Sequence, residues 1–409
     1  MRSVDQVVTP SVSATVPPIR RRSLRYVAYL VLLVINVINL LSYANFWPSA
    51  PTTAHDDALR YLAMSQNTFA GVDNPFALRF LSPFIVHQLA KTGLGLNDAW
   101  ILLTFVATTA TLIVFFKIVY DHFRLSLFLS LTVSLMLACT YWYVLYNLED
   151  HWLVDPVNNL AIAAAVYTAL RARPVWFTAV VLIGSVNKET IMMFAPLHVL
   201  LTWARGERVR SKAFLVGIAA LGITAVAYLG FRIWMQTHLP PTVNYSPLVG
   251  AGTGNTATDN FRGSIGVDKK EHQFAIMETF HFMWFPFLYG LYQATRQQPL
   301  RNPLLVAGGY TFFICLTGRL FASDIQRIMV MMAPVLFMIA ALNLTHLDTP
   351  RHRPWLLLLG FTYIAINLHW IPTNVAVVLD ILALIVLMIP AVLNQPTTTH
   401  PTISTQEQW

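Results

Sequence analysis

Long apolar runs, each close to the length that crosses a lipid bilayer, constrain this chain more than any other feature. A helix needs about 20 apolar residues to cross about 30 Å of hydrocarbon, and it satisfies its own backbone hydrogen bonds there. The clearest runs cover residues 26–47, 99–119, 125–146, 213–235 and 328–347. We therefore predict an all-α polytopic integral membrane protein.

The charge content agrees with that class. Only 11% of the residues are charged and 56% are hydrophobic, whereas a soluble domain carries about 25% charged residues. The net charge is +8, but the basic residues lie in short clusters between the apolar runs, as the positive-inside rule describes. We therefore expect no nucleic-acid partner.

Shorter apolar runs raise the expected number of helices. They cover residues 157–170, 279–294, 303–317, 355–370 and 374–393, and they bring the total to about 10–12 transmembrane or re-entrant helices. We expect a cytoplasmic basic segment over 1–25, a membrane domain over 26–393 and a disordered tail over 394–409. We expect further helices in the outer loops and no soluble domain.

One apolar stretch, residues 175–203, is interrupted by charge at Lys188 and Glu189. Each half has about a dozen residues, too few to span the bilayer alone. Basic residues flank both ends, so a re-entrant hairpin that returns to its own side is favoured over one long helix with a buried charged pair.

The distribution of Lys and Arg also orients the chain. With both termini in the cytoplasm, every basic cluster falls on the cytoplasmic side. The outer side then holds long loops over 48–98 and 236–278, together with a short acidic loop over 149–155. We predict a multi-pass protein of the cytoplasmic (inner) membrane with its active face extracytoplasmic.

The first acidic cluster, His55, Asp56 and Asp57, follows the first apolar run. Paired carboxylates can act as a general base, or hold a divalent cation together with a histidine. The alternative is that Asp56 or Asp57 caps a helix over 58–69. We select Asp56 and Asp57 as catalytic candidates, and all three residues as a candidate magnesium or manganese site.

The second acidic cluster comprises Glu149, Asp150, His151 and Asp155. It shares a side with the first cluster, so the two could form one site. A solvated loop is the alternative. From this cluster we select Glu149 and Asp150 as catalytic candidates.

Cationic side chains on the same face suit a lipid phosphate, since guanidinium and ammonium groups bind phosphate oxygens strongly. The alternatives are an ion pair within Lys188-Glu189, a head-group anchor for Arg79, and pairing of the late arginines with Asp324. The candidate lipid-phosphate ligands are Arg79, Lys188, Glu189, Arg319 and Arg327.

These motifs in this order resemble the GT-C superfamily, membrane glycosyltransferases that use polyprenyl-phosphate-linked sugars. The resemblance rests on His55-Asp56-Asp57, on Arg-Phe-Leu-Ser-Pro over 79–83, on Lys-Glu-Thr over 188–190 and on a late arginine. The two aspartates are contiguous where relatives carry Asp-x-Asp, so the metal requirement stays open.

The resemblance implies a GT-C-like fold and transfer of a hexose or pentose, with inversion, to a glycan, lipid or protein acceptor. Asp56 or Asp57 would take the acceptor proton, and Lys188 with Arg319 or Arg327 would neutralise the departing polyprenyl phosphate. The alternatives are a transporter or flippase of a lipid-linked or anionic substrate, an O-antigen-type polymerase or ligase, and a non-catalytic scaffold.

Overall fold

The computed structural model describes residues 18–44, 56–67, 72, 76–238, 269–297, 301–318 and 325–393. Within those ranges every regular element is a helix and no strand occurs, so the all-α prediction is confirmed. The first elements are α1 (Pro18–Tyr43), α2 (Asp56–Gln66), η2 (Phe76–Leu78), α3 (Leu81–Lys91), α4 (Leu96–Phe116), η3 (Lys117–His122), α5 (Leu127–Ala138), η4 (Tyr141–Leu145), α6 (Tyr146–Glu149) and α7 (Asp155–Leu170).

The second half of the described chain continues in the same way. Its elements are α8 (Pro174–Asn187), η5 (Glu189–Phe194), α9 (Leu197–Ala204), α10 (Lys212–His238), α12 (Lys269–Phe280), η6 (His281–Met283), α13 (Trp284–Gln297), α14 (Pro303–Gly318), α15 (Ile325–Met329), η7 (Val330–Met332), α16 (Ala333–Asn343), η8 (Leu344–Leu347), α17 (Arg353–Asn367) and α18 (Thr373–Leu393).

Four stretches of the described chain are long and apolar enough to cross a membrane, and a bent pair makes a possible fifth. The four are Ser23–Tyr43, Leu96–His122, Lys212–Met235 and Ile325–Leu347. They support a membrane-embedded helical protein. Shorter apolar helices such as α8 and α14 fall below that length, so the expected total of about 10–12 membrane segments stays a prediction.

The predicted span over 125–146 contains a bend, so it is either one broken span or a re-entrant segment. The chain bends by 64° between Leu127–Ala138 and Tyr141–Glu149. New partners replace the helical hydrogen bonds at the bend: Thr140 Oγ1 donates to the Met136 carbonyl at 3.0 Å, and the Tyr141 N–H donates to Asn367 Oδ1 at 3.0 Å. These side chains pair with backbone groups at the bend, so fewer polar groups are left without a partner in an apolar setting.

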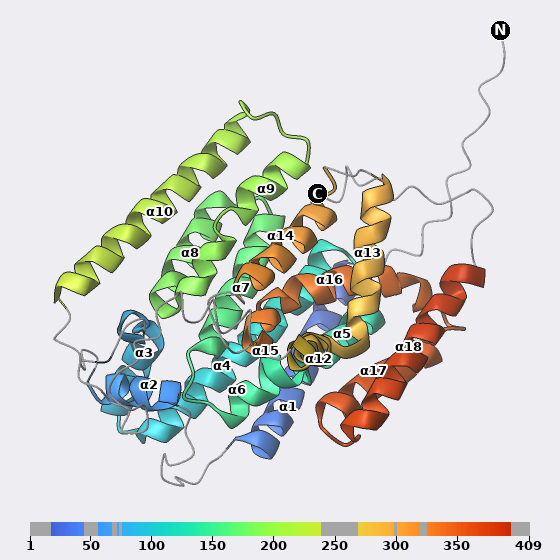
Figure 1. The fold of residues 1–409 in the computed structure, drawn as a ribbon, viewed down its shortest axis with the longest axis horizontal. Coiled ribbons are helices and arrows are strands. Elements are labelled where there is room, and N and C mark those ends of the chain that lie inside the picture. Colours follow the sequence, from blue (N-terminus) through green and yellow to red (C-terminus); the bar gives the residue numbers. More distant parts are fainter. Residues whose placement is uncertain are drawn as a thin grey trace.

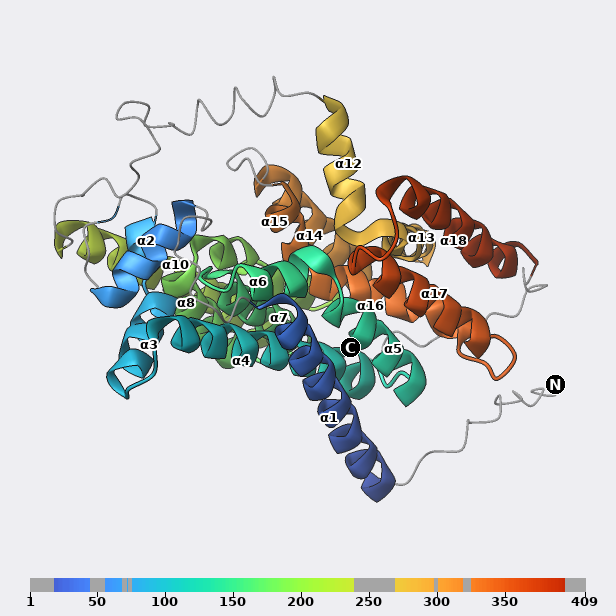
Figure 2. The same cartoon turned by 90° about the horizontal axis from the view of Figure 1, so that it is seen from below.

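The helices surround α16, which packs against α5, α7, α13 and α14. In the most apolar 18 residues of Ile325–Leu347, 83% of the residues are buried. In the most apolar 18 residues of Lys212–Met235, only 11% are buried. α10 therefore lies at the edge of the molecule, as Figure 1 shows, and presents most of its surface outward. α2 with α3 and α17 with α18 lie at opposite ends in both views (Figures 1 and 2).

Proline positions explain where several helices begin. α7, α8, α16 and α17 each carry a proline in the first turn, where its missing N–H breaks no helical bond and its fixed φ suits the helix. Polar side chains then join helices across the interior. Asn36 of α1 donates to Thr108 Oγ1 at 2.9 Å and to Thr109 Oγ1 at 2.7 Å on α4.

A small apolar cluster fixes α2 and α3 beside the beginning of α4. Its buried members include Tyr61, Trp100 and Leu153, which come from α2, from α4 and from the loop before α7. Burial of these large side chains provides the driving force for docking α2 onto the membrane helices. The docking brings Asp57, also on α2, toward the beginning of α7.

Candidate functional site

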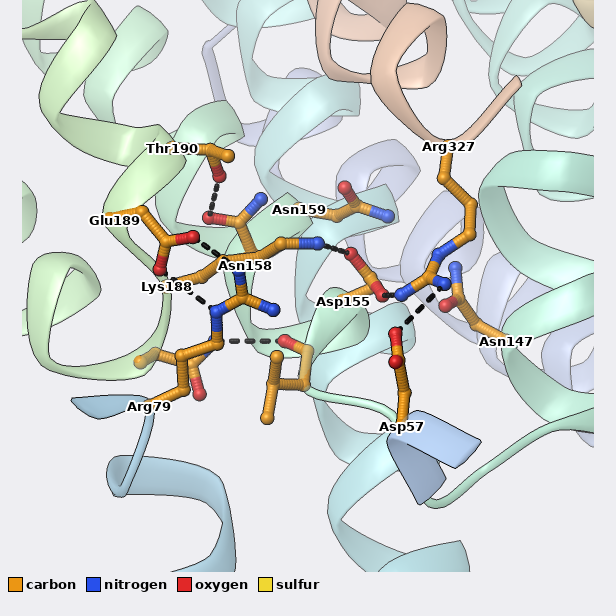
Figure 3. A network of polar contacts seen from close by, with 12 residues as sticks. Asp57, Arg79, Asn147, Asp155, Asn158, Asn159, Lys188, Glu189, Thr190 and Arg327 are labelled. Carbon is orange, nitrogen blue, oxygen red and sulfur yellow. Dashed lines mark hydrogen bonds and ion pairs between the residues drawn. The ribbon is translucent and has the colours of Figure 1, made fainter. Parts of the chain in front are cut away.

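A network of charged side chains lies where α2, α3, the beginning of α7, the tip of the α8–η5 turn, α10 and α15 approach one another. Its members come from widely separated parts of the sequence, and Figure 3 shows most of them at close range. They are Asp57, Arg79, Asp155, Lys188, Glu189, Arg232 and Arg327.

The interrupted stretch reverses direction at Lys188. The backbone of Lys188 is extended, with φ −156° and ψ 132°, between α8 and η5. At the other end, Arg205 Nη2 donates to the carbonyls of Ala169 and Leu170, at 2.9 and 3.0 Å. One long helix is therefore wrong, and the path agrees with the predicted hairpin; its re-entry into a bilayer stays a prediction.

Buried polar contacts hold the tip of the hairpin in place. The side chain of Asn187, fully buried, donates to the Val154 carbonyl at 2.8 Å and accepts a hydrogen bond from Ser82 Oγ. Close packing of α8 on α7 also holds the tip in place. The two helices lie so near each other at Gly184 that a Cβ there would be 2.8 Å from the Cβ of Ala161. The tip is thus tied to both α3 and α7.

Asp155, the first residue of α7, joins two cations. Its Oδ1 accepts a hydrogen bond from Lys188 Nζ, and its Oδ2 accepts one from Arg327 Nη2 at 2.6 Å. Arg327 Nη1 also lies 3.4 Å from Asp57 Oδ2. The side chain of Asp155 is 9% exposed and that of Asp57 is 27% exposed. Asp57 is therefore the more accessible carboxylate of the pair.

Glu189 organises the other half of the network. Arg79 donates two hydrogen bonds to the Glu189 carboxylate, from Nε at 2.8 Å and from Nη2. Arg232 Nη2 lies 3.5 Å from Glu189 Oε2. Arg79 Nη1 also donates to the Tyr61 hydroxyl at 3.0 Å. Tyr61 and Asp57 are one turn apart on α2, so this helix links both halves.

The pKa values of Arg79 and Tyr61 fix their protonation. Burial lowers the pKa of the Arg79 guanidinium, but the hydrogen bond to the Tyr61 hydroxyl and the ion pair with Glu189 raise it by more, so it lies above its ordinary value. Burial raises the pKa of the Tyr61 phenol. Arg79 is therefore charged and Tyr61 neutral at physiological pH.

Charge in the network does not balance. Among the described side chains, the cations Arg79, Lys188, Arg232 and Arg327 face the carboxylates Asp57, Asp155 and Glu189. Among these seven described side chains, the cations therefore outnumber the carboxylates by one, in a partly buried setting. Unbalanced charge near hydrocarbon is unfavourable, so this arrangement suits an anionic ligand.

The structure decides two alternatives that the sequence left open. Lys188 and Glu189 do not form their ion pairs with each other: Lys188 pairs with Asp155, and Glu189 pairs with Arg79 and Arg232. Also, α2 begins at Asp56 rather than at residue 58. Asp57 therefore lies inside the first turn and is not its N-cap, and its carboxylate is directed to Arg327.

Asp155 is the main member of the second acidic cluster that belongs to the network. The sequence places Asp155 in that cluster but gives no reason to select it as a site residue. Glu149 is exposed and accepts a hydrogen bond from the Tyr141 hydroxyl at 2.8 Å. Asp150 is buried, and its N–H donates to the Tyr146 carbonyl at 2.8 Å. The catalytic roles suggested for Glu149 and Asp150 stay predictions.

Some predicted residues lie outside the described part of the chain. These are His55, Arg319 and the side chain of Asp56. The described member of the suggested metal site, Asp57, lies against a guanidinium, a neighbour that does not fit a shared divalent cation. Among the described residues, no group of three or more His, Cys, Asp or Glu could hold a metal ion. We therefore derive no step through a metal.

Arg232 and Tyr61 belong to the network but were not expected from the sequence. The sequence could have indicated Arg232 as a site residue, because a single arginine near the end of the long apolar run 213–235 is energetically costly unless it serves a function. Tyr61 carried none, since its role depends on how α2 docks.

No family model matches this sequence, and no curated protein matches it significantly. Any functional conclusion therefore depends on the chemistry of the network itself.

Proposed function

We propose that this protein is a membrane glycosyltransferase that moves a sugar from a polyprenyl-phosphate donor to an acceptor at the extracytoplasmic face. The observation that carries the proposal is the network itself. It sets Asp57, a partly exposed carboxylate, beside Arg327, within a group of charges that has one cation in excess. A base next to an anion-binding group is what transfer from a lipid phosphate requires.

The proposed reaction is a single displacement at the anomeric carbon. The acceptor hydroxyl oxygen forms a bond to that carbon, and the bond from the carbon to the phosphate oxygen breaks. Its electron pair leaves with the polyprenyl phosphate, while the hydroxyl proton passes to Asp57. Attack opposite the leaving group inverts the anomeric configuration. The acceptor is a glycan, a lipid or a protein.

Asp57 suits the role of base better than Asp155. Asp155 is 9% exposed and bonds both Lys188 and Arg327, so it has little capacity left for an acceptor hydroxyl. Asp57 is 27% exposed, and its one ion pair among the described residues is the 3.4 Å contact to Arg327. Asp155 then acts as a positioning residue that holds the two cations.

A transporter is the second candidate, because the broken α8–η5–α9 segment resembles the discontinuous helices of transporter sites. The two functions differ in one measurable event. A transferase breaks the bond between sugar and phosphate, whereas a transporter delivers the donor intact to the other leaflet.

The test uses membranes that contain the protein and undecaprenyl phosphates carrying a radiolabelled hexose or pentose. Transfer moves the label from the undecaprenyl phosphate to the acceptor, and chromatography separates the labelled donor from the labelled product. For Asp57→Asn we expect the rate to fall by about 100-fold or more, as for loss of a general base, with undecaprenyl phosphate still bound.

Asp348→Asn is the matched control, because Asp348 also pairs with an arginine, Arg353, at 3.1 Å. It should transfer at the wild-type rate. Wild-type transfer by Asp57→Asn would remove Asp57 from the mechanism. Intact donor appearing in the opposite leaflet, with none cleaved, would favour the transporter.

A further inference from the structure

The excess positive charge of the network is confined to one half. On one side, Lys188 and Arg327 face Asp155 and Asp57, so the charges cancel. On the other side, Arg79 and Arg232 share a single carboxylate, Glu189. An anionic ligand is therefore attracted most strongly to the Arg79–Glu189–Arg232 half.

Arg232 has an unused donor in that half. Its Nε donates to the Tyr228 hydroxyl at 2.8 Å and its Nη2 lies 3.5 Å from Glu189. Its Nη1 is buried and has no hydrogen-bond partner among the described residues. A buried donor without an acceptor costs free energy, and a phosphate oxygen would relieve that cost.

The position of Arg232 also favours a ligand that arrives from the bilayer. It lies on α10, whose surface is mostly outward, and Leu229 and Ile233 beside it are 58% and 62% exposed. Arg79 reaches the same carboxylate from the α3 side, where Phe80 packs on Phe231 with ring centroids 5.9 Å apart. The outward face of α10 therefore borders the half of the network that carries both arginines.

We propose that Arg79 and Arg232 bind the phosphate of the lipid-linked donor, and that Glu189 occupies this position when no ligand is bound. The inference rests on the proposed function and locates the phosphate within it. Lys188 and Arg327, already neutralised by carboxylates, instead orient Asp155 and Asp57. Asp57 and Tyr61 lie one turn apart on α2, so this helix carries both the base and the hydroxyl that Arg79 contacts.

The test measures binding of undecaprenyl phosphate to the full chain in lipid nanodiscs. Arg232→Gln should weaken the affinity by about tenfold or more, as expected for loss of a charge-assisted hydrogen bond. Arg232→Lys should recover part of it. Arg327→Gln should change the affinity by less than about threefold, since that arginine is already paired. Arg353→Gln, remote from the network, is the control.

Glu189→Gln separates a binding role from a purely structural one. Removal of the competing carboxylate should tighten binding, whereas loss of a structural ion pair would weaken it. A thermal melt of each variant confirms that it is folded. Unchanged affinity in Arg232→Gln, a larger loss in Arg327→Gln than in Arg232→Gln, or weaker binding in Glu189→Gln would each overturn the inference.

Two further experiments extend the test. One identifies the source of the phosphate, and the other tests this inference independently of the proposed function. Inorganic phosphate and UDP-glucose should not displace the lipid; binding of these alone would assign the site to a water-soluble anion and overturn the lipid assignment. Arg232-dependent binding without cleavage of any donor would leave the phosphate site standing and refute the transferase. Donor cleavage together with binding that does not depend on Arg232 would support the transferase and refute the phosphate site.

Discussion

Replacement of Asp155 with asparagine removes a carboxylate that both Lys188 and Arg327 contact. The three side chains are only 9%, 12% and 15% exposed, so solvent screens the two cations poorly once their shared partner is gone. Loss of one partner from a buried ion pair costs about 3–5 kcal/mol. We therefore expect Asp155→Asn to lower the free energy of unfolding by about that amount.

The charge balance predicts how a second substitution behaves. Asp155→Asn leaves its half of the network with one excess cation, and Lys188→Met leaves it with one excess anion. The double variant is again neutral in these four positions, because Arg327 still faces Asp57. Its destabilisation should be smaller than the sum of the two single effects by about 1 kcal/mol or more.

The assay is equilibrium unfolding by sodium dodecyl sulfate in mixed micelles, with helix content followed by circular dichroism. Asp348→Asn is the control, because its partner Arg353 is 42% exposed and exposed pairs contribute about 0–1 kcal/mol. If Asp155→Asn were no more destabilising than Asp348→Asn, or if the double variant were strictly additive, the assignment of Asp155 as the shared counterion would fail.

Three further predictions concern packing, metal dependence and sidedness. Gly184→Ala should destabilise the protein by about 1–3 kcal/mol in the same assay, because its Cβ would overlap a neighbouring helix; Gly222→Ala, with open space around it, should not. The chelator EDTA should leave sugar transfer unchanged, because Asp57 lies against a guanidinium; a loss that magnesium or manganese restores would contradict this. A cysteine at Arg208 should react with a membrane-impermeant maleimide only from the cytoplasmic side, and one at Thr92 only from the outside; the reverse pattern would refute the orientation.

The sequence by itself was enough to predict the helical membrane class, because apolar length and charge spacing are local properties of the chain. It also marked Lys188 and Glu189 as exceptional, since charge inside an apolar stretch is costly wherever the helices pack. Asp57, Arg79 and Arg327 were recognised as candidates for similar reasons. None of these features depends on knowing which helix lies next to which.

The tertiary structure decided which charges meet. Asp155 contacts Arg327 across 172 positions of sequence, and Arg79 contacts Glu189 across 110. The first pair depends on how α7 and α15 pack, and the second on how the segment before α3 lies against η5. Helix packing is set by side-chain shape over many residues, which no local pattern records. For the same reason the structure alone paired Glu189 with Arg232 and separated it from Lys188. The one-sided charge predicted from the sequence thus became a specific network in which the location of the excess cation is defined.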